Sequence, residues 1–328
     1  MNQASTFLAR FLFLLLIIGI GISDIFGNES AEAYPVVVLE SSFGLMFGTA
    51  TQEVIFQDYK LSELDWSSIP LFYFGSSLEL RFPTGLISRF GVAYALSGHS
   101  GSMTDSDWKN YDNVLTNFSS SESWTEKAYI LSIELTYDFA LSETLVIEPL
   151  ISVGYQEFGW TSRGGSYWYP VEVFPPLPDG TITTGPVTPI SSNTPFANLH
   201  TTGIIYEQRS IYLGFGFSLI WRPSASLEFE TSLSATPLVT MESKDEHTFR
   251  KLVFAGTLGG GLVLRPEFRF EYRVSDSLGI NLDLEYLGLQ GLAGGIGVSD
   301  DQGNFLGAED AKDSFAALKS QVSLRVRL

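Results

Sequence analysis

Residues 129–139 read YILSIELTYDF, and from Leu131 onward apolar or aromatic side chains alternate with polar ones. The same alternation recurs at 280–286 (INLDLEY) and at 322–328 (VSLRVRL). A period of two is the signature of a β-strand, because successive side chains point to opposite faces. One face of these strands is apolar and the other carries charge. Such strands fit either a soluble sandwich, with the apolar faces in a core, or a membrane barrel, with the apolar face in lipid.

Three features favour the barrel. Aromatic residues recur near the expected strand ends, as in the interfacial girdles of outer-membrane barrels. The connections between strands alternate between short and long. The last residues of the chain form a strand, which would close the sheet and leave no edge. We therefore predict an all-β fold, a ten-stranded antiparallel transmembrane β-barrel.

The expected strands and links follow from the alternation and the turn residues. The ten strands are predicted at 36–56, 66–82, 86–103, 127–141, 144–164, 203–222, 227–242, 250–274, 278–293 and 313–328. Four short links would face the periplasm, and five long links would face outward: 57–65, 104–126, 165–202, 243–249 and 294–312. No further domain is expected within 34–328.

Residues 1–33 resemble a cleaved secretory signal peptide. Arg10 supplies the positive charge, Phe11 to Ile22 the apolar run, and Ala31-Glu32-Ala33 a small-x-small cleavage site. The alternative is a membrane anchor, but this apolar run is shorter than the roughly 20 residues that span a bilayer as a helix.

Composition excludes several functions. The chain has no Cys, so no disulfide or thiolate chemistry is available. Its net charge of −18 argues against nucleic acid and favours cationic partners. The three histidines, His99, His200 and His247, show no metal-ligand spacing. We therefore expect chemistry that requires neither a metal ion nor a cofactor.

Two acidic segments are candidates for chemistry: Asp105-Ser106-Asp107 and Asp245-Glu246-His247. In each, the paired residues are two apart and share a face of an extended strand. In a ten-strand ring the two hairpins lie on opposite walls at the outer rim. His247 could then act as a general base held by Asp245, with Asp105 and Asp107 holding a water across the cleft.

Non-catalytic interpretations of both acidic segments stay open at this point. An Asp-x-Asp in a loop is commonly a solvated turn or a weak cation site, and an Asp-Glu-His is commonly surface. No G-x-S-x-G elbow is present, so a covalent acyl-enzyme has little support.

The order of several motifs resembles the omptin family, the outer-membrane aspartate/histidine endopeptidases on ten-stranded barrels. The motifs are KLSELDW at 60–66, GSMTDSDW at 101–108, GYQE at 154–157, RGGSY at 163–167 and DEH at 245–247. The resemblance implies a catalytic set of Asp105, Asp107, Asp245 and His247, which activates a water for attack on a peptide bond.

The resemblance also implies cleavage beside basic residues, with acids at the base of the cleft. Glu53 matches the acid of one subsite, and Glu126 matches an acid for the residue after the cut. The second acid of the first subsite is replaced by Ser243, with Lys244 beside it. One carboxylate holds a desolvated guanidinium less well than two, so we expect a weaker or altered basic preference.

Omptins also bind lipopolysaccharide on the outer wall, which makes it a candidate activator here. Tyr155, Glu157 and Arg209 match that site, whereas Gly159 stands where the family has a basic residue. The expected protein is a monomer in the outer membrane, with its active site facing the exterior and basic peptides as substrates. Two other functions remain: a non-catalytic adhesin or receptor, and a passive pore.

Overall fold

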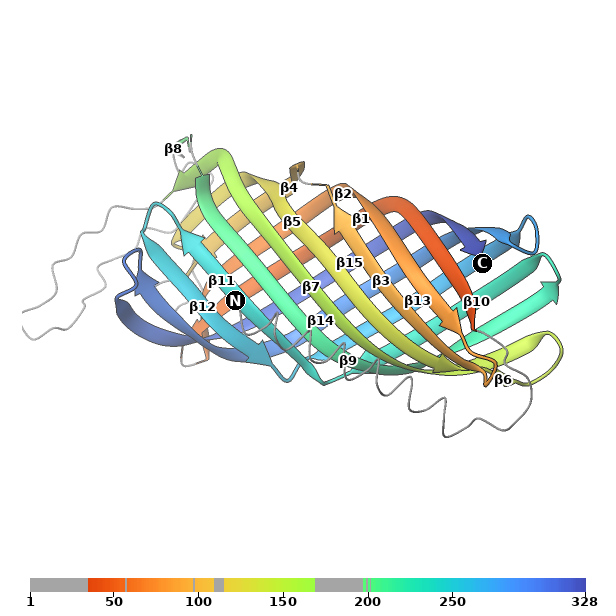
Figure 1. The fold of residues 1–328 in the computed structure, drawn as a ribbon. Coiled ribbons are helices and arrows are strands. Elements are labelled where there is room, and N and C mark those ends of the chain that lie inside the picture. The colour runs from red at the N-terminus through yellow and green to blue at the C-terminus, as the bar shows by residue number, and fades with distance from the viewer. Residues whose placement is uncertain are drawn as a thin grey trace, which may run out of the picture.

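The fold was obtained as a computed structural model that describes residues 35–328 apart from 57, 97, 109–114, 169–196, 199 and 201. The expected signal peptide at 1–33 lies outside the described residues. In the described part, strands follow one another around a ring (Figure 1). No helix long and apolar enough to cross a membrane occurs among these residues.

The strands are long, and several of them reach 20 residues or more. In chain order they are β1 Val36–Phe56, β2 Tyr59–Arg81, β3 Leu86–Ala95, β4 Gly98–Asp107, β5 Asn117–Tyr137, β6 Phe139–Ala140, β7 Leu145–Trp168, β8 Ala197–Asn198, β9 Thr202–Ser224, β10 Leu227–Thr236, β11 Val239–His247, β12 Leu252–Gly259, β13 Leu262–Arg273, β14 Leu278–Asp300 and β15 Phe305–Arg327.

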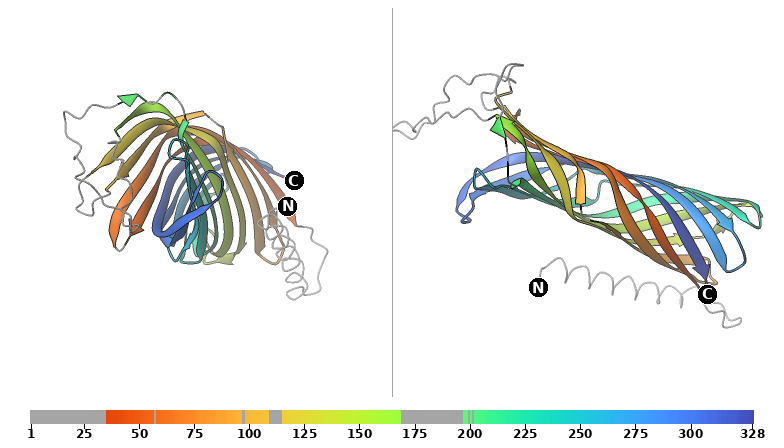
Figure 2. Two further views of the ribbon diagram at one scale, coloured as in Figure 1. Left: turned by 90° about the vertical axis from the view of Figure 1, so that its left-hand side faces the viewer. Right: turned by 90° about the horizontal axis from the view of Figure 1, so that it is seen from above.

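The sheet closes on itself. β1 pairs antiparallel with both β2 and β15, so the first and last strands meet (Figure 2). Each other position in the ring, here called a wall, pairs with the walls that precede and follow it in the chain. Three walls consist of two strands each, namely β3 with β4, β10 with β11, and β12 with β13. The two-residue strands β6 and β8 only add short pairings at the two ends of β7. With these set aside and each two-strand wall counted once, ten walls remain, so the predicted ten-stranded antiparallel barrel is confirmed.

Several long links were predicted wrongly, because the strands extend further at one end of the barrel. β1 and β2 stay paired up to Phe56 and Tyr59, and the turn between them places Asp58 at a φ of 69°. β14 and β15 stay paired up to Ser299 and Phe305. Polar residues on both strand faces look like loop in a sequence, but a strand outside lipid can be polar on both faces.

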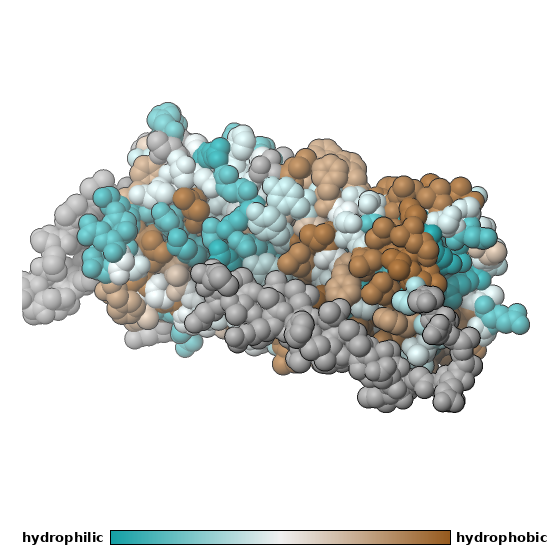
Figure 3. All heavy atoms as spheres, viewed as in Figure 1, coloured by the Kyte–Doolittle hydropathy of each residue, from teal (hydrophilic) through white to brown (hydrophobic). Residues whose placement is uncertain are grey.

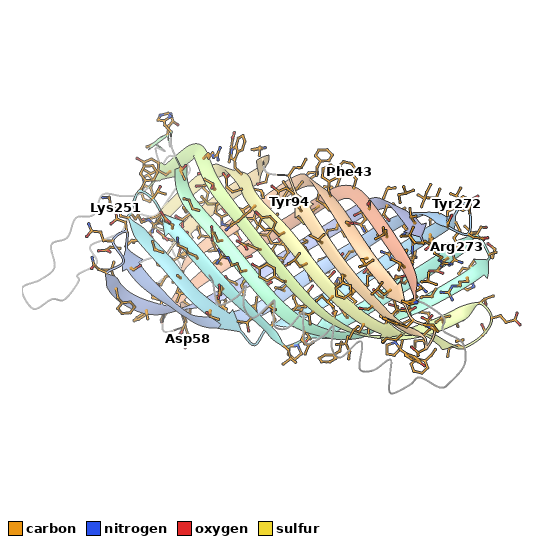
Figure 4. The ribbon with its side chains drawn as sticks, in the orientation of Figure 1. Phe43, Asp58, Tyr94, Lys251, Tyr272 and Arg273 are labelled. Atoms are coloured by element: carbon orange, nitrogen blue, oxygen red, sulfur yellow. The ribbon has the colours of Figure 1, made fainter. Side chains whose placement is uncertain are left out.

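The outer wall has two halves. Exposed apolar side chains gather in the half that holds the chain's C-terminal end, and the opposite half is mainly polar (Figure 3). Figure 4 places Phe43 on this apolar wall, with Asp58 and Lys251 at the far polar end. The apolar half is the belt expected of a barrel in lipid. Its members include Phe43, Phe47, Phe72, Phe74, Phe215, Phe217, Leu282, Leu318 and Val322.

Charged side chains of both signs fill the barrel interior behind this belt. Arg325 contacts Glu79 and Glu271, and Arg265 contacts Glu134 and Glu285. Because such pairs cross from wall to wall, they occupy the space that a wide channel would need. This arrangement argues against the passive pore.

Candidate active site

The four predicted catalytic residues lie at the polar end of the barrel. Asp105 and Asp107 end β4, and Asp245 and His247 end β11. In both strands the alternation points these side chains inward, and their residues are only 1–5% exposed. Closure of the ring brings together two walls that are far apart in the sequence. The two segments therefore face each other in the structure, as the sequence analysis predicted.

Asp245 holds the His247 ring. The imidazole Nε2 lies 2.6 Å from Asp245 Oδ2. An ionised carboxylate only accepts hydrogen bonds, so Nε2 carries the proton and Nδ1 is the basic nitrogen. Burial lowers the pKa of His247, but the charge and hydrogen bond of Asp245 outweigh it, and the pKa lies above its ordinary value of 6.5.

The basic nitrogen faces the opposite wall. His247 Nδ1 lies 4.0 Å from Asp105 Oδ2. Asp107 is the next inward-facing residue of β4. It accepts a hydrogen bond of 3.1 Å from the side chain of Asn117, which lies at the start of β5. The Asp pair and the Asp–His pair therefore face each other across a narrow gap.

Arg250, which sequence reasoning missed, reaches into this gap. It follows β11 in the turn at 248–251, and its Nη2 lies 2.8 Å from Asp105 Oδ2 and 3.4 Å from Asp107 Oδ2. Its only signal in the sequence is its place three residues after His247, which does not indicate whether its side chain points into the gap. The guanidinium offsets the charge of two buried carboxylates.

Two cavities adjoin His247 and Arg250. One, of about 250 Å³, is walled by Gln52, Leu64, Phe254 and Glu309. The other, of about 160 Å³, is walled by Met103, Ser121, Ile204 and Phe249. A peptide laid across the gap could place side chains from either side of one bond in the two cavities.

Glu53 does not reach the site. Its side chain points to the other face of β1, and its carboxylate lies 3.6 Å from Lys60 Nζ. The inward neighbour Gln52 takes its place, with Nε2 at 2.6 Å from Ser243 Oγ. Neighbouring residues of a strand point to opposite faces, so Gln52 and not Glu53 reaches the interior from this part of β1.

Glu126 also lies away from the cleft. A bulge in the β5–β7 pairing surrounds it, and its half-exposed carboxylate pairs with Arg163 at 2.5 Å. Arg163 in turn stacks on Trp124, with its guanidinium carbon 4.8 Å from the ring centroid. This pair belongs to the outer surface.

A buried polar cluster lies beneath the larger cavity. The Tyr206 hydroxyl contacts Gln208 Nε2 at 2.6 Å, Asp313 Oδ2 at 3.1 Å and Ser243 Oγ at 3.5 Å. Three acceptors in it have no hydrogen-bond partner among the described residues: Gln52 Oε1, Gln208 Oε1 and Asp313 Oδ1. β15 thus supplies two inward acids that sequence reasoning missed, Asp313 at depth and Glu309 on the cavity wall.

The three residues matched to a lipopolysaccharide site do lie together on the outer wall. Glu157 accepts a hydrogen bond of 2.8 Å from Tyr155 and lies 3.2 Å from Arg209. Lys127 joins them, with Nζ 2.7 Å from Glu157. Its side chain covers Gly159 so closely that a Cβ there would come within 2.9 Å of it. A cation from β5 therefore occupies the place that the missing basic residue leaves.

The family model that describes the Omptin family matches residues 35–326. The chain belongs to the Omptin family. Among solved structures, the Escherichia coli outer membrane protease OmpT shares 14% identity and a TM-score of 0.77, covering 92% of this chain and 99% of that one. The omptin barrel is therefore the fold of this chain, and its place is the outer membrane.

Other barrels match less well. The translocator domain of the autotransporter NalP from Neisseria meningitidis shares 10% identity with a TM-score of 0.39, covering 98% of this chain and 97% of that one. A comparison with curated proteins gave no match.

Proposed function

We propose that this omptin is an endopeptidase in which His247, held by Asp245, activates a water against a peptide bond, with Asp105 and Asp107 opposite. The observation that carries the proposal is the gap of 4.0 Å between His247 Nδ1 and Asp105 Oδ2. A single water that bridges these two atoms, with hydrogen bonds of about 2.8 Å, would span it.

The proposed reaction moves one proton through His247. The water oxygen bonds to the carbonyl carbon while Nδ1 takes a water proton, and Asp245 stabilises the resulting imidazolium. The C–N bond then breaks, and the leaving amine takes that proton from Nδ1. Asp105 orients the water through the oxygen that faces the imidazole. No covalent acyl-enzyme forms.

Substrates with a basic residue beside the cut bond fit the larger cavity. Gln52 and Ser243 offer it no charge, but Asp107, Asp245 and Glu309 line its wall, and Asp313 lies opposite Gln52 in the β1–β15 pairing. The three unpartnered buried acceptors of the cluster suit a donor-rich ammonium or guanidinium group. We infer a basic preference that depends on Glu309 and Asp313 of β15 rather than on Glu53 and Ser243.

We further propose that the active site faces the exterior and that lipopolysaccharide activates the enzyme. The site lies at the end opposite the short turns, which face the periplasm in outer-membrane barrels. Lys127 and Arg209 on the outer wall could contact lipid phosphates beside Tyr155 and Glu157.

The test is cleavage of a mixed peptide library by the purified barrel, with and without lipopolysaccharide, with cut sites determined by mass spectrometry. His247→Ala should lower kcat by about 10²–10⁴-fold, the usual contribution of a general base. His99→Ala is the matched control, because His99 is an exposed histidine that packs on the edge of Trp124. Cleavage that survives His247→Ala would sink the mechanism. A folded protein that binds basic peptides without cutting them would support the adhesin instead.

A further inference from the structure

Water attack on an amide needs a group that stabilises the negative charge on the carbonyl oxygen. His247 accepts a proton, and the three aspartates of the site are acceptors when ionised, so none of them supplies a positive donor. Among the described residues that line the two cavities, Arg250 is the one cation besides His247. Its contacts decide whether it can act on the reacting carbonyl.

Arg250 shares one atom with the water-activating pair. Asp105 Oδ2 lies 2.8 Å from Arg250 Nη2 and 4.0 Å from His247 Nδ1. The guanidinium and the imidazole therefore approach the same carboxylate oxygen. A water bound to that oxygen and to Nδ1 lies beside the guanidinium, and so does a carbonyl that this water attacks.

Burial points the same way. The Asp105 side chain is 0% exposed and that of Asp107 is 3% exposed, whereas the Arg250 side chain is 26% exposed. The guanidinium thus lies between the buried carboxylates and the open cleft. The two aspartates fix its position before any substrate arrives, as a preorganised donor requires.

We propose that Arg250 is a catalytic residue that stabilises the oxyanion of the tetrahedral intermediate. This inference rests on the proposed endopeptidase function. As water adds, the carbonyl π pair moves onto oxygen, and guanidinium N–H groups donate to that oxygen. When the C–N bond breaks, the pair returns to re-form the carbonyl, and Arg250 keeps its own protons throughout.

Two lesser roles are the alternatives. Arg250 could only keep the neighbouring carboxylates ionised, or it could block the cleft as an internal cation that a basic substrate must displace. The three roles predict different kinetics. An oxyanion donor raises kcat at every pH, a charge-setting residue moves the pH profile, and a blocking residue lowers kcat/KM.

The experiment measures kcat and KM from pH 5 to 10 for the full barrel and for Arg250→Gln and Arg250→Lys. The substrate is a quenched fluorescent peptide chosen from the library cuts. We expect Arg250→Gln to lower the plateau kcat by about 10²–10³-fold with KM nearly unchanged, as for loss of an oxyanion donor. Arg250→Lys keeps the positive charge but not the planar set of guanidinium N–H donors, so it should recover part of the lost kcat. Lys251→Gln is the matched control, since that neighbouring side chain is 72% exposed.

A second measurement separates catalysis from folding. A peptide phosphonate carries a tetrahedral anion, and it should bind the wild type at least tenfold more tightly than the parent peptide. Arg250→Gln should lose that preference while it still binds the parent peptide, which also shows that it is folded. A plateau kcat restored at high pH, or a rise in kcat/KM, would overturn the inference. If the wild type itself cuts nothing, the proposed function fails instead.

Discussion

Gln52 and Ser243 are 191 positions apart, yet the Gln52 side-chain amide donates a hydrogen bond of 2.6 Å to the Ser243 hydroxyl inside the barrel. The resemblance to omptins places a pair of acids at this depth. Here Gln52 and Ser243 meet as a neutral pair, with Asp313 directly opposite Gln52 in the β1–β15 pairing. Besides Asp107 and Asp245, which line the larger cavity, the acids near this neutral pair are Glu309 and Asp313 of β15.

Returning an acid to β11 should strengthen the basic preference. Ser243→Asp adds a carboxylate beside the larger cavity, and a charge-assisted hydrogen bond contributes about 1.5–3 kcal/mol. We expect kcat/KM for an arginine peptide, relative to its citrulline counterpart, to rise by at least tenfold. Ser243→Asn is the control, because it has nearly the same shape without the charge. An equal change in both variants would mean that shape rather than charge sets the preference.

The acid limb of the pH profile should follow His247. The imidazole must be neutral to act as a base, so activity is present above its pKa and lost as pH falls through it. The pKa of His247 lies above 6.5 because Asp245 outweighs burial. Asp245→Asn should lower kcat by at least 10²-fold and move the acid limb to lower pH.

The control for this profile is Glu246→Gln. Glu246 lies between the two residues in sequence, but its half-exposed side chain points outward and pairs with Lys244 at 3.3 Å. It should leave both kcat and the acid limb unchanged. A profile of Asp245→Asn that keeps the wild-type limb would show that another group titrates there.

Lys127 should set the response to lipopolysaccharide. Its ammonium lies 2.7 Å from Glu157 and 3.0 Å from Glu207, within the cluster that also holds Arg209. Removal of a phosphate-binding cation should weaken binding, and Lys127→Ala is expected to raise the half-activating lipopolysaccharide concentration by about tenfold. Lys127→Arg should restore it. Activation curves that coincide for the wild type and Lys127→Ala would exclude this contact.

The barrel could be predicted because it depends on a period of two, and so could the shared face of each candidate pair in the site. The spacing of two predicted that Asp105 shares a face with Asp107 and that Asp245 shares a face with His247, although both pairs were placed in links rather than strands. The same period explains the failures. Glu53 was one residue away from Gln52, and a single step moved it to the outer wall, where it pairs with Lys60.

Other features depended on contacts that no local pattern contains. Arg250 follows a strand end, and only ring closure reveals that it meets Asp105, 145 positions away. Lys127 covers Gly159 from the neighbouring strand, a cross-strand contact that a linear match to the family cannot register. Asp313 sits in a polar run that we had placed at the edge of a loop.

Asp313 should make substrate choice depend on pH. Burial raises the pKa of its carboxyl to about 6, so its charge is present above that pH and is lost as pH falls through it. It lies outside the apolar belt, five residues before Leu318 in β15, and Tyr206, Gln208, Gln52 and Ser243 surround it. The preference for arginine over citrulline peptides should therefore increase between pH 5 and 7. Because His247 acts on both substrates alike, its own titration cancels in the ratio.

Asp313→Asn should remove that increase and lower the ratio above pH 7 by about tenfold, as expected for loss of one charge-assisted contact. Asp310→Asn is the matched control, since Asp310 lies on the same strand but is exposed on the outside. The measurement is kcat/KM for the two peptides across the pH range, with thermal unfolding to confirm that each variant is folded. A ratio in Asp313→Asn that still climbs through pH 6 would assign the charge to another carboxyl, and Glu309 on the cavity wall would be the next residue to change.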